Sequence, residues 1–119
     1  MSSIISLLDG VCPEIESQLK PRLSGLQRFL IIQFLPQTWV FETENQVVSL
    51  VVDQQGSAFT QAMNRGGRDV TIRWKHDYLA SVLKTRSIAH VPQGESPTII
   101  FHSLKGRTAF DFLRKRLGL

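Results

Sequence analysis

The chain has 119 residues, of which 42% are hydrophobic and 20% are charged, and its formal net charge is +4 at pH 7. This length is typical of one domain that can bury its own hydrophobic core, and the composition excludes an intrinsically disordered protein. The longest purely apolar run, Phe29 to Ile32, is too short for a membrane-spanning helix, which needs roughly 20 apolar residues. We therefore expect a single globular domain over residues 1–119.

The single cysteine and the N-terminal charges predict where the protein resides. Cys12 cannot form an internal disulfide, which favours a reducing compartment. Within residues 1–20 the acidic residues come before the first basic residue, unlike the basic start of a secretory signal. The sequence therefore predicts a cytoplasmic protein in which Cys12 is a small buried hydrophobic residue.

The first third of the chain is predicted to be helical. Residues 3–8 have the apolar spacing of a short amphipathic helix, which Gly10 would end. A second helix is predicted from Pro13 to about Phe34, because apolar residues recur there every three or four positions: Ile15, Leu19, Leu23, Leu26 and Leu30. Pro21 should kink this helix or begin a new segment, since proline lacks a backbone N–H and clashes with the preceding turn.

Residues 38–74 alternate between apolar and polar positions and predict four β-strands. Turn signals at residues 44–46, 54–56 and 64–67 divide them. Because these connections are too short for a crossover helix, we predict an antiparallel meander. The segment Val47 to Val52 is apolar on both faces, so we expect it in the middle of the sheet with cover on each side.

After Trp74 the pattern changes to that of a helix. Residues 77–85 predict a helix with Leu79, Val82 and Leu83 on one face, and residues 98–103 predict a fifth strand after a long loop. A closing helix is expected over residues 106–119, with Thr108 and Asp111 resembling a capping box and Gly118 at its end. The order of elements predicts an α+β fold: a single five-stranded, mainly antiparallel sheet with helices packed on it.

The residue types that usually catalyse reactions or bind metals do not form a known motif in this sequence. His76, His90 and His102 are never three or four positions apart, so we interpret them as surface or strand-edge residues and predict no metal and no cofactor. The glycine-rich phosphate-binding motifs are missing as well.

Three acidic residues lie near the ends of predicted strands, where an enzyme would place catalytic carboxylates. We interpret Asp53 as opening a turn, Asp69 as a solvent-exposed strand residue and Asp77 as the start of a helix. The sequence therefore predicts a protein that is not an enzyme.

Basic residues concentrate in the second half of the chain and would attract phosphates of nucleic acid or of lipid headgroups. The alternative is an ordinary solvated surface. The aromatic signature of RNA-recognition modules is missing, so nucleic-acid binding is not the favoured interpretation. The cluster consists of Arg65, Arg68, Arg73, Lys75, Lys84, Arg86, Lys105, Arg107, Arg114, Lys115 and Arg116.

Three segments resemble the sterol-binding domain of the sterol carrier protein 2 family. "RDVTIRWKHDYLASVL" (68–83) has that family's strand that starts with aspartate and runs directly into a helix. "FETENQVVSLVVDQQGSAFTQ" resembles its earlier hairpin, and "TIIFHSLKGRTAFDFLRKRL" its last strand and helix. The resemblance covers residues 20–118, with residues 1–12 as an N-terminal extension. It departs at "KTRSIAHVPQGESPTIIFHS", where a loop replaces a helix that would help to wall the family's pocket.

The resemblance implies an SCP2-like domain that binds or carries an apolar ligand, such as a fatty acyl chain, a sterol or an isoprenoid tail. No catalytic residue is implied. The predicted ligand-lining residues, each of which has an ordinary core position as the alternative, are Phe41, Leu50, Phe59, Met63, Ile72, Trp74, Leu79, Val82, Leu83, Phe101, Phe110, Leu113 and Leu117. The basic residues Arg114, Lys115 and Arg116 are expected to contact an anionic membrane surface.

Two alternatives to lipid carriage stay open from the sequence. The first is an accessory module with a filled core that forms a homodimer through the apolar segment Leu26 to Phe34. The second is nucleic-acid binding through the late basic cluster.

Overall fold

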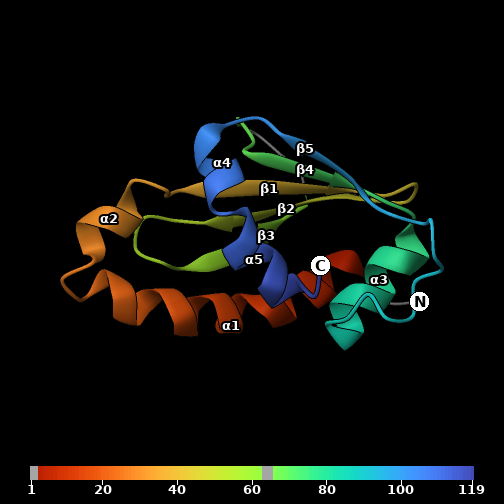
Figure 1. Cartoon of the computed structure of the whole chain (residues 1–119), viewed down its shortest axis with the longest axis horizontal. Helices are drawn as coiled ribbons and strands as arrows, with labels where there is room; N and C mark the ends of the chain where they lie inside the picture. Colours follow the sequence, from red (N-terminus) through yellow and green to blue (C-terminus); the bar gives the residue numbers. More distant parts are fainter. Residues whose placement is uncertain (1–2, 63–65) are drawn as a thin grey trace.

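The structure, a computed structural model, describes residues 3–62 and 66–119. Its five strands form one sheet with the order β3-β2-β1-β4-β5 (Figure 1). The strands are β1 (Gln37–Glu42), β2 (Val47–Val52), β3 (Ala58–Gln61), β4 (Val70–Arg73) and β5 (Thr98–Phe101). Strands β1 and β4 run parallel, whereas the other neighbouring pairs are antiparallel. The predicted α+β fold with one five-stranded, mainly antiparallel sheet is confirmed.

The predicted meander is wrong at the fourth strand. Strand β4 does not pair with β3 but lies on the far side of β1, where Phe41 is opposite Ile72. The two-residue period identifies each strand but not its neighbour, and the segment from residue 62 to residue 69 is long enough to cross the sheet. The turn predicted at residues 64–67 lies partly outside the described residues.

Strand β2 has the predicted position inside the sheet, between β1 and β3. The cover expected on both of its faces is incomplete. Leu50 faces the helices and is buried, whereas on the other face Ser49 is buried, Val51 is half-buried and Val47 is 45% exposed.

The N-terminal helix α1 (Ile4–Leu23) continues through both Gly10 and Pro13, so the predicted stop at Gly10 is wrong. One apolar stripe runs the whole length of the helix and is buried in the core: Ile4, Leu8, Val11, Cys12, Ile15, Leu19 and Leu23. Burial of this stripe against the sheet outweighs the local preference of glycine and proline for other conformations. Residues 4–12 are therefore the first half of the principal helix.

The helix predicted to reach Phe34 ends at Leu23, and the chain turns before the short helix α2 (Arg28–Ile32). The stripe loses contact with the core after this break. Leu26 is 95% exposed and Leu30 is 51% exposed, and α2 contains no buried residue. Leu26 and Leu30 keep the helical spacing of the apolar residues in the sequence, but they do not pack against the core.

The remaining helices are α3 (His76–Thr85), α4 (Leu104–Thr108) and α5 (Phe110–Leu117). Helix α3 confirms the helix predicted over residues 77–85. The single closing helix is wrong, because Ala109 divides it into α4 and α5. Helices α1, α3 and α5 lie along one face of the sheet (Figure 1).

The predicted capping box at Thr108 is also wrong. The Thr108 hydroxyl donates to the carbonyl of Leu104, and the Asp111 carboxylate accepts from Arg114. The residue that caps a helix is Ser103, whose hydroxyl accepts from the backbone N–H of Gly106 at 3.0 Å. Gly118 ends α5 as predicted, with a φ of 90° that favours glycine.

Asp69 is buried, with 7% of its surface exposed, so the prediction of a solvent-exposed residue is wrong. Its carboxylate accepts hydrogen bonds from the backbone N–H of Thr38 at 2.8 Å and from the Ser103 hydroxyl at 2.5 Å. The Lys105 ammonium lies 3.8 Å away. Gly106 packs directly on this residue, since a Cβ there would lie 2.6 Å from the Asp69 carbonyl oxygen. Asp69 thus joins β1 and β4 to the start of α4.

We predict that Asp69→Ala lowers the free energy of unfolding by about 2 to 4 kcal/mol, because it leaves buried donors without their acceptor. Urea denaturation followed by circular dichroism measures the loss. Asp77→Ala, which changes an exposed carboxylate in the first turn of α3, is the matched control and should cost less than about 1 kcal/mol. Equal losses in the two variants would contradict the role assigned to Asp69.

Candidate functional site

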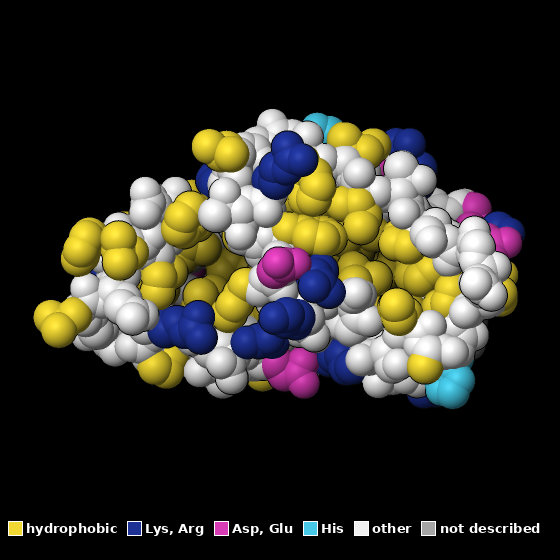
Figure 2. Space-filling model, viewed as in Figure 1, with side chains coloured by type: hydrophobic (Ala, Val, Ile, Leu, Met, Phe, Trp, Pro, Cys, Tyr) yellow, Lys and Arg dark blue, Asp and Glu magenta, His cyan; other side chains and the backbone are white. Residues whose placement is uncertain are grey.

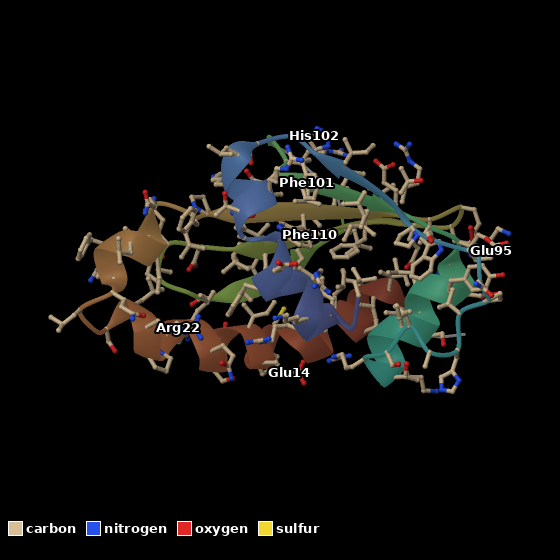
Figure 3. All side chains as sticks on the ribbon, in the orientation of Figure 1. Glu14, Arg22, Glu95, Phe101, His102 and Phe110 are labelled. Carbon is tan, nitrogen blue, oxygen red and sulfur yellow. The ribbon has the colours of Figure 1, made fainter. Side chains whose placement is uncertain are left out.

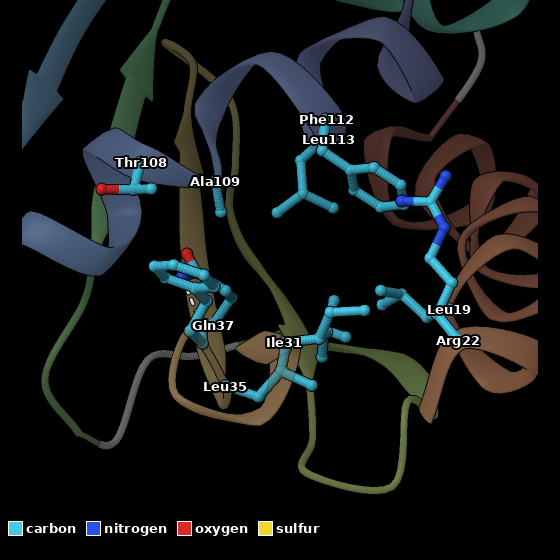
Figure 4. A pocket seen from close by; sticks show the side chains of 11 residues that line it. Leu19, Arg22, Ile31, Leu35, Gln37, Thr108, Ala109, Phe112 and Leu113 are labelled. Carbon is cyan, nitrogen blue, oxygen red and sulfur yellow. Dashed lines mark hydrogen bonds between the residues drawn. The ribbon is translucent and has the colours of Figure 1, made fainter. Parts of the chain in front are cut away.

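A cavity of about 180 Å³ lies where α1 ends, between α2, the start of β1 and the junction of α4 with α5 (Figure 4). The break after Leu23 and the break at Ala109 both border it, so the two irregular points of the helical layer meet here. The lining residues are Leu19, Arg22, Ile31, Phe34, Leu35, Gln37, Val52, Thr108, Ala109, Phe112 and Leu113.

Two of the three polar side chains in this lining, Gln37 and Thr108, are hydrogen-bonded within the protein, and the third is Arg22. The Gln37 amide donates to the carbonyl oxygens of Phe34 and Lys105, at 2.7 and 2.9 Å, and its oxygen accepts from the Trp39 indole at 3.0 Å. The Thr108 hydroxyl donates within α4. The cavity therefore offers an apolar surface with few free hydrogen-bonding groups, which suits an apolar guest.

Two guanidinium groups flank one aromatic ring at the edge of the cavity. Arg22, near the end of α1, stacks on the Phe112 ring at 5.4 Å, and Arg116 stacks on it at 4.7 Å (Figure 3 shows Arg22). Such contacts between a cation and a ring are stabilising. Phe112 itself borders the cavity, so these two cations hold part of its wall in place.

The volume limits what the cavity can enclose. A cavity of roughly 150 Å³ in another protein accommodates benzene, whereas pockets that enclose a drug-sized molecule span roughly 300 to 1,000 Å³. At about 180 Å³, this cavity is too small to enclose a lipid-sized molecule as a whole. Part of a molecule of that size would stay outside the cavity.

Of the predicted ligand-lining residues, Leu113 borders the cavity. A larger group is buried in the main core between the sheet and the helices: Phe41, Leu50, Ile72, Trp74, Leu79, Val82, Leu83 and Leu117. Met63 lies outside the described residues.

The other three predicted lining residues are aromatic and are not fully buried. Phe110 stacks on Trp39 with ring centroids 5.7 Å apart and meets Phe101 edge-on at 5.1 Å (Figure 3). Phe101 is 38% exposed, and Phe59 is 41% exposed. Phe59 is paired with Val51 and so lies on the face of the sheet opposite to the helices.

The structure adds lining residues that the sequence patterns did not indicate. Ile31, Phe34 and Leu35 come from a segment that reads as a continuous helix, and Ala109 and Phe112 fall outside the buried stripe of the closing helix. The break at residues 24–27 creates the site, and the local signals near it are Gly25 and Pro21, although Pro21 itself lies inside α1.

The three cations predicted to contact a membrane point in different directions and have different surroundings. Arg114 donates to the Asp111 carboxylate at 2.7 Å, and this contact lowers the pKa of Asp111. Arg116 lies on the Phe112 ring, and Lys115 is exposed. Successive residues of a helix differ by about 100° in direction, which explains the divergence.

Titratable side chains do not converge on this cavity. Burial, and then the nearby carboxylates of Asp9 and Glu16, raise the pKa of Cys12 to about 11, so its thiol stays protonated at neutral pH. Hydrogen bonds from Arg68 and Arg73, each at 2.9 Å, lower the pKa of Glu42 on the other face of the sheet.

The described part of the chain contains neither a metal-binding group of side chains nor a membrane-spanning helix. Within residues 3–62 and 66–119, the His, Cys, Asp and Glu side chains form no group of three that could hold a metal. His76 is buried at the start of α3, contrary to the predicted surface position, whereas His90 and His102 are exposed. In the same described ranges, no helix is both long and apolar enough to cross a membrane.

Comparisons with known proteins give similarities among solved structures but not among family models or curated sequences. No family model matches the chain, and no curated protein sequence matches it significantly. Among solved structures, the chain is similar to one described as "UbiJ-SCP2 Ubiquinone synthesis protein", with 21% sequence identity, a TM-score of 0.46 and 88% of each chain covered. The printed name of that structure includes the family that the sequence resembles.

Proposed function

We propose that the protein binds an apolar, lipid-type ligand and does not change it chemically. The observation that carries this proposal is the cavity between α1, α2 and the α4–α5 junction, whose polar lining groups Gln37 and Thr108 are bound within the protein. An apolar group that enters this space leaves the hydrogen bonds of Gln37 and Thr108 intact.

The size of the cavity favours a ligand with a narrow apolar end. Six methylene groups removed from water contribute about 5 kcal/mol at roughly 0.8 kcal/mol each, and association itself costs at least about 4 kcal/mol. Enclosing the end alone therefore gives weak binding, and useful affinity requires further contact along the ligand. A fatty acyl chain or an isoprenoid tail provides this, and a sterol would enter with its narrow side chain.

Several features support a binding role and not a catalytic one. The lining contains no carboxylate, thiol or imidazole, and the Cys12 thiol is buried elsewhere with a raised pKa. We infer a cytoplasmic carrier or lipid-presenting protein. The lining residues expected from the sequence, including Leu113, stay a prediction.

We predict that Ala109→Phe weakens the binding of a dansyl-labelled undecanoic acid at least about tenfold, because the new ring fills the space where the ligand end would lie. The Ala109 side chain points into the cavity from the α4–α5 junction (Figure 4). Fluorescence titration gives the dissociation constant, and thermal unfolding shows that the variant is folded.

Ala89→Phe is the matched control for this experiment. It makes the same substitution at an exposed position in the loop after α3, and its affinity for the probe should equal that of the unmodified protein. Unchanged probe affinity in a folded Ala109→Phe variant would contradict the assignment of this cavity as the ligand site.

A further inference from the structure

Large apolar side chains project into solvent at one end of the molecule. Leu26 is 95% exposed, Phe29 is 70% exposed and Leu30 is 51% exposed. We call these three residues the α2 tip. They lie at one end of the longest axis, which measures 42 Å, and Figure 2 shows the apolar side chains that protrude there. Monomeric soluble proteins rarely leave large apolar side chains grouped in this way, and such groups mark interaction sites.

The α2 tip belongs to the segment that walls the cavity. Ile31, Phe34 and Leu35 follow it directly and line the space within. On the other side of the cavity, α4 carries Leu104, which is 79% exposed, while Thr108 of the same helix borders the cavity. Exposed apolar side chains therefore stand on both sides of the site, on elements that also form its walls (Figures 1 and 2).

The two segments that carry these side chains contain basic residues but no acidic ones. Residues 17–41 and residues 96–110 contain no aspartate or glutamate. They contain the cations Lys20, Arg22, Arg28, Lys105 and Arg107. A surface that combines projecting apolar residues with cations such as Arg28 is complementary to anionic lipid headgroups above an apolar layer.

The nearest carboxylates are already bound within the protein. Glu16 pairs with Lys20 at 3.6 Å and accepts from the backbone N–H of Ala58. Asp53 accepts from two backbone N–H groups in the turn between β2 and β3. Glu16 thus offsets Lys20, and Asp69, whose carboxylate lies 3.8 Å from the Lys105 ammonium, offsets Lys105. Among the described residues, Arg22, Arg28 and Arg107 form no ion pair, so they carry the positive charge of this end.

We propose that the α2 tip and Leu104 dock the protein on the surface of an anionic lipid bilayer. This inference rests on the proposed function, because docking would place the cavity next to the lipid from which its ligand is drawn. The apolar side chains enter the boundary between headgroups and acyl chains, and Arg28 meets the lipid phosphates. Each cation near such a surface contributes roughly 1 kcal/mol.

A second copy of the chain fits this surface less well. A symmetric dimer through the α2 tip would place each Arg28 and its neighbouring cations near the same cations of the other copy. With the acids of this end already engaged, that arrangement brings like charges together and lacks compensating partners. An anionic membrane supplies those partners.

The test measures how the protein distributes between water and vesicles of phosphatidylcholine with and without phosphatidylglycerol. The double variant Leu26→Ser and Phe29→Ser should reduce partitioning onto the anionic vesicles at least about tenfold. Arg28→Gln should weaken binding to the anionic vesicles only. The matched control is Ile88→Ser, which removes a 56% exposed apolar side chain after α3, and its partitioning should equal that of the unmodified protein.

Titration with the dansyl-labelled fatty acid, without vesicles, separates docking from ligand binding. The proposal predicts that the double variant keeps its probe affinity while it loses vesicle binding. Equal vesicle binding by the double variant and the unmodified protein would overturn the docking surface. A protein that binds vesicles through the α2 tip but never binds the probe would refute the proposed function alone.

The oligomeric state tests the alternative that the α2 tip joins two copies of the chain. Sedimentation at several concentrations should show the same mass for the unmodified protein and the double variant. A dimer that the double variant converts to a monomer, together with no vesicle binding, would overturn the proposal and assign the α2 tip to contact between two copies.

Discussion

The buried carboxylate of Asp69 holds together the parts of the chain on which the architecture depends. It accepts hydrogen bonds from Thr38 of β1 and from Ser103, the cap of α4, while its own backbone pairs with Thr38 and His102. A buried charge is stable only when its hydrogen bonds are made, so these contacts fix their partners in position. Asp69 therefore stabilises both the parallel pairing of β1 with β4 and the position of α4. Because α4 leads directly to Ala109 and α5, Asp69 also sets one wall of the cavity.

The cavity exists because the helical layer is interrupted at two points. Helix α1 ends at Leu23, and the chain then leaves the core before it returns through Ile31 and Leu35 to β1. On the opposite side of the cavity, Ala109 separates α4 from α5. The space beside Leu113 at this break is part of the cavity. Close packing holds elsewhere in the main core, where Trp39, Phe41 and their neighbours are fully buried.

Much of the secondary structure could be predicted from the sequence, because it depends on local periodicity. The alternation around Ile72 identified β4, and the helical spacing of Leu79, Val82 and Leu83 identified α3. The position of β4 beside β1 could not be predicted, since pairing depends on contacts such as Asp69 with Thr38 that are distant in sequence. A buried aspartate and an exposed one look alike until their partners are known.

The candidate site was harder to predict than the fold for the same physical reason. Leu26 and Leu30 continue the apolar spacing of α1, yet the structure leaves them in solvent. Pro21 and Gly25 indicate a bend in the helix but not the loss of tertiary contact after Leu23. Phe112 does not belong to the buried stripe of α5, and its role in the cavity wall depends on Arg22 from the other end of the chain. Among the residues expected to line a ligand that the structure describes, which leaves out Met63, Leu113 is the one that borders this cavity.

Native mass spectrometry of the purified protein, with solvent extraction of anything bound, tests most directly whether the cavity holds the end of a lipid. A protein that carries such a ligand should show a bound apolar molecule in a fixed ratio to the chain, and Ala109→Phe should reduce the bound fraction. The mass of the bare chain in every preparation, together with no binding of added fatty acid, would contradict lipid binding and indicate a protein whose function lies on its surface.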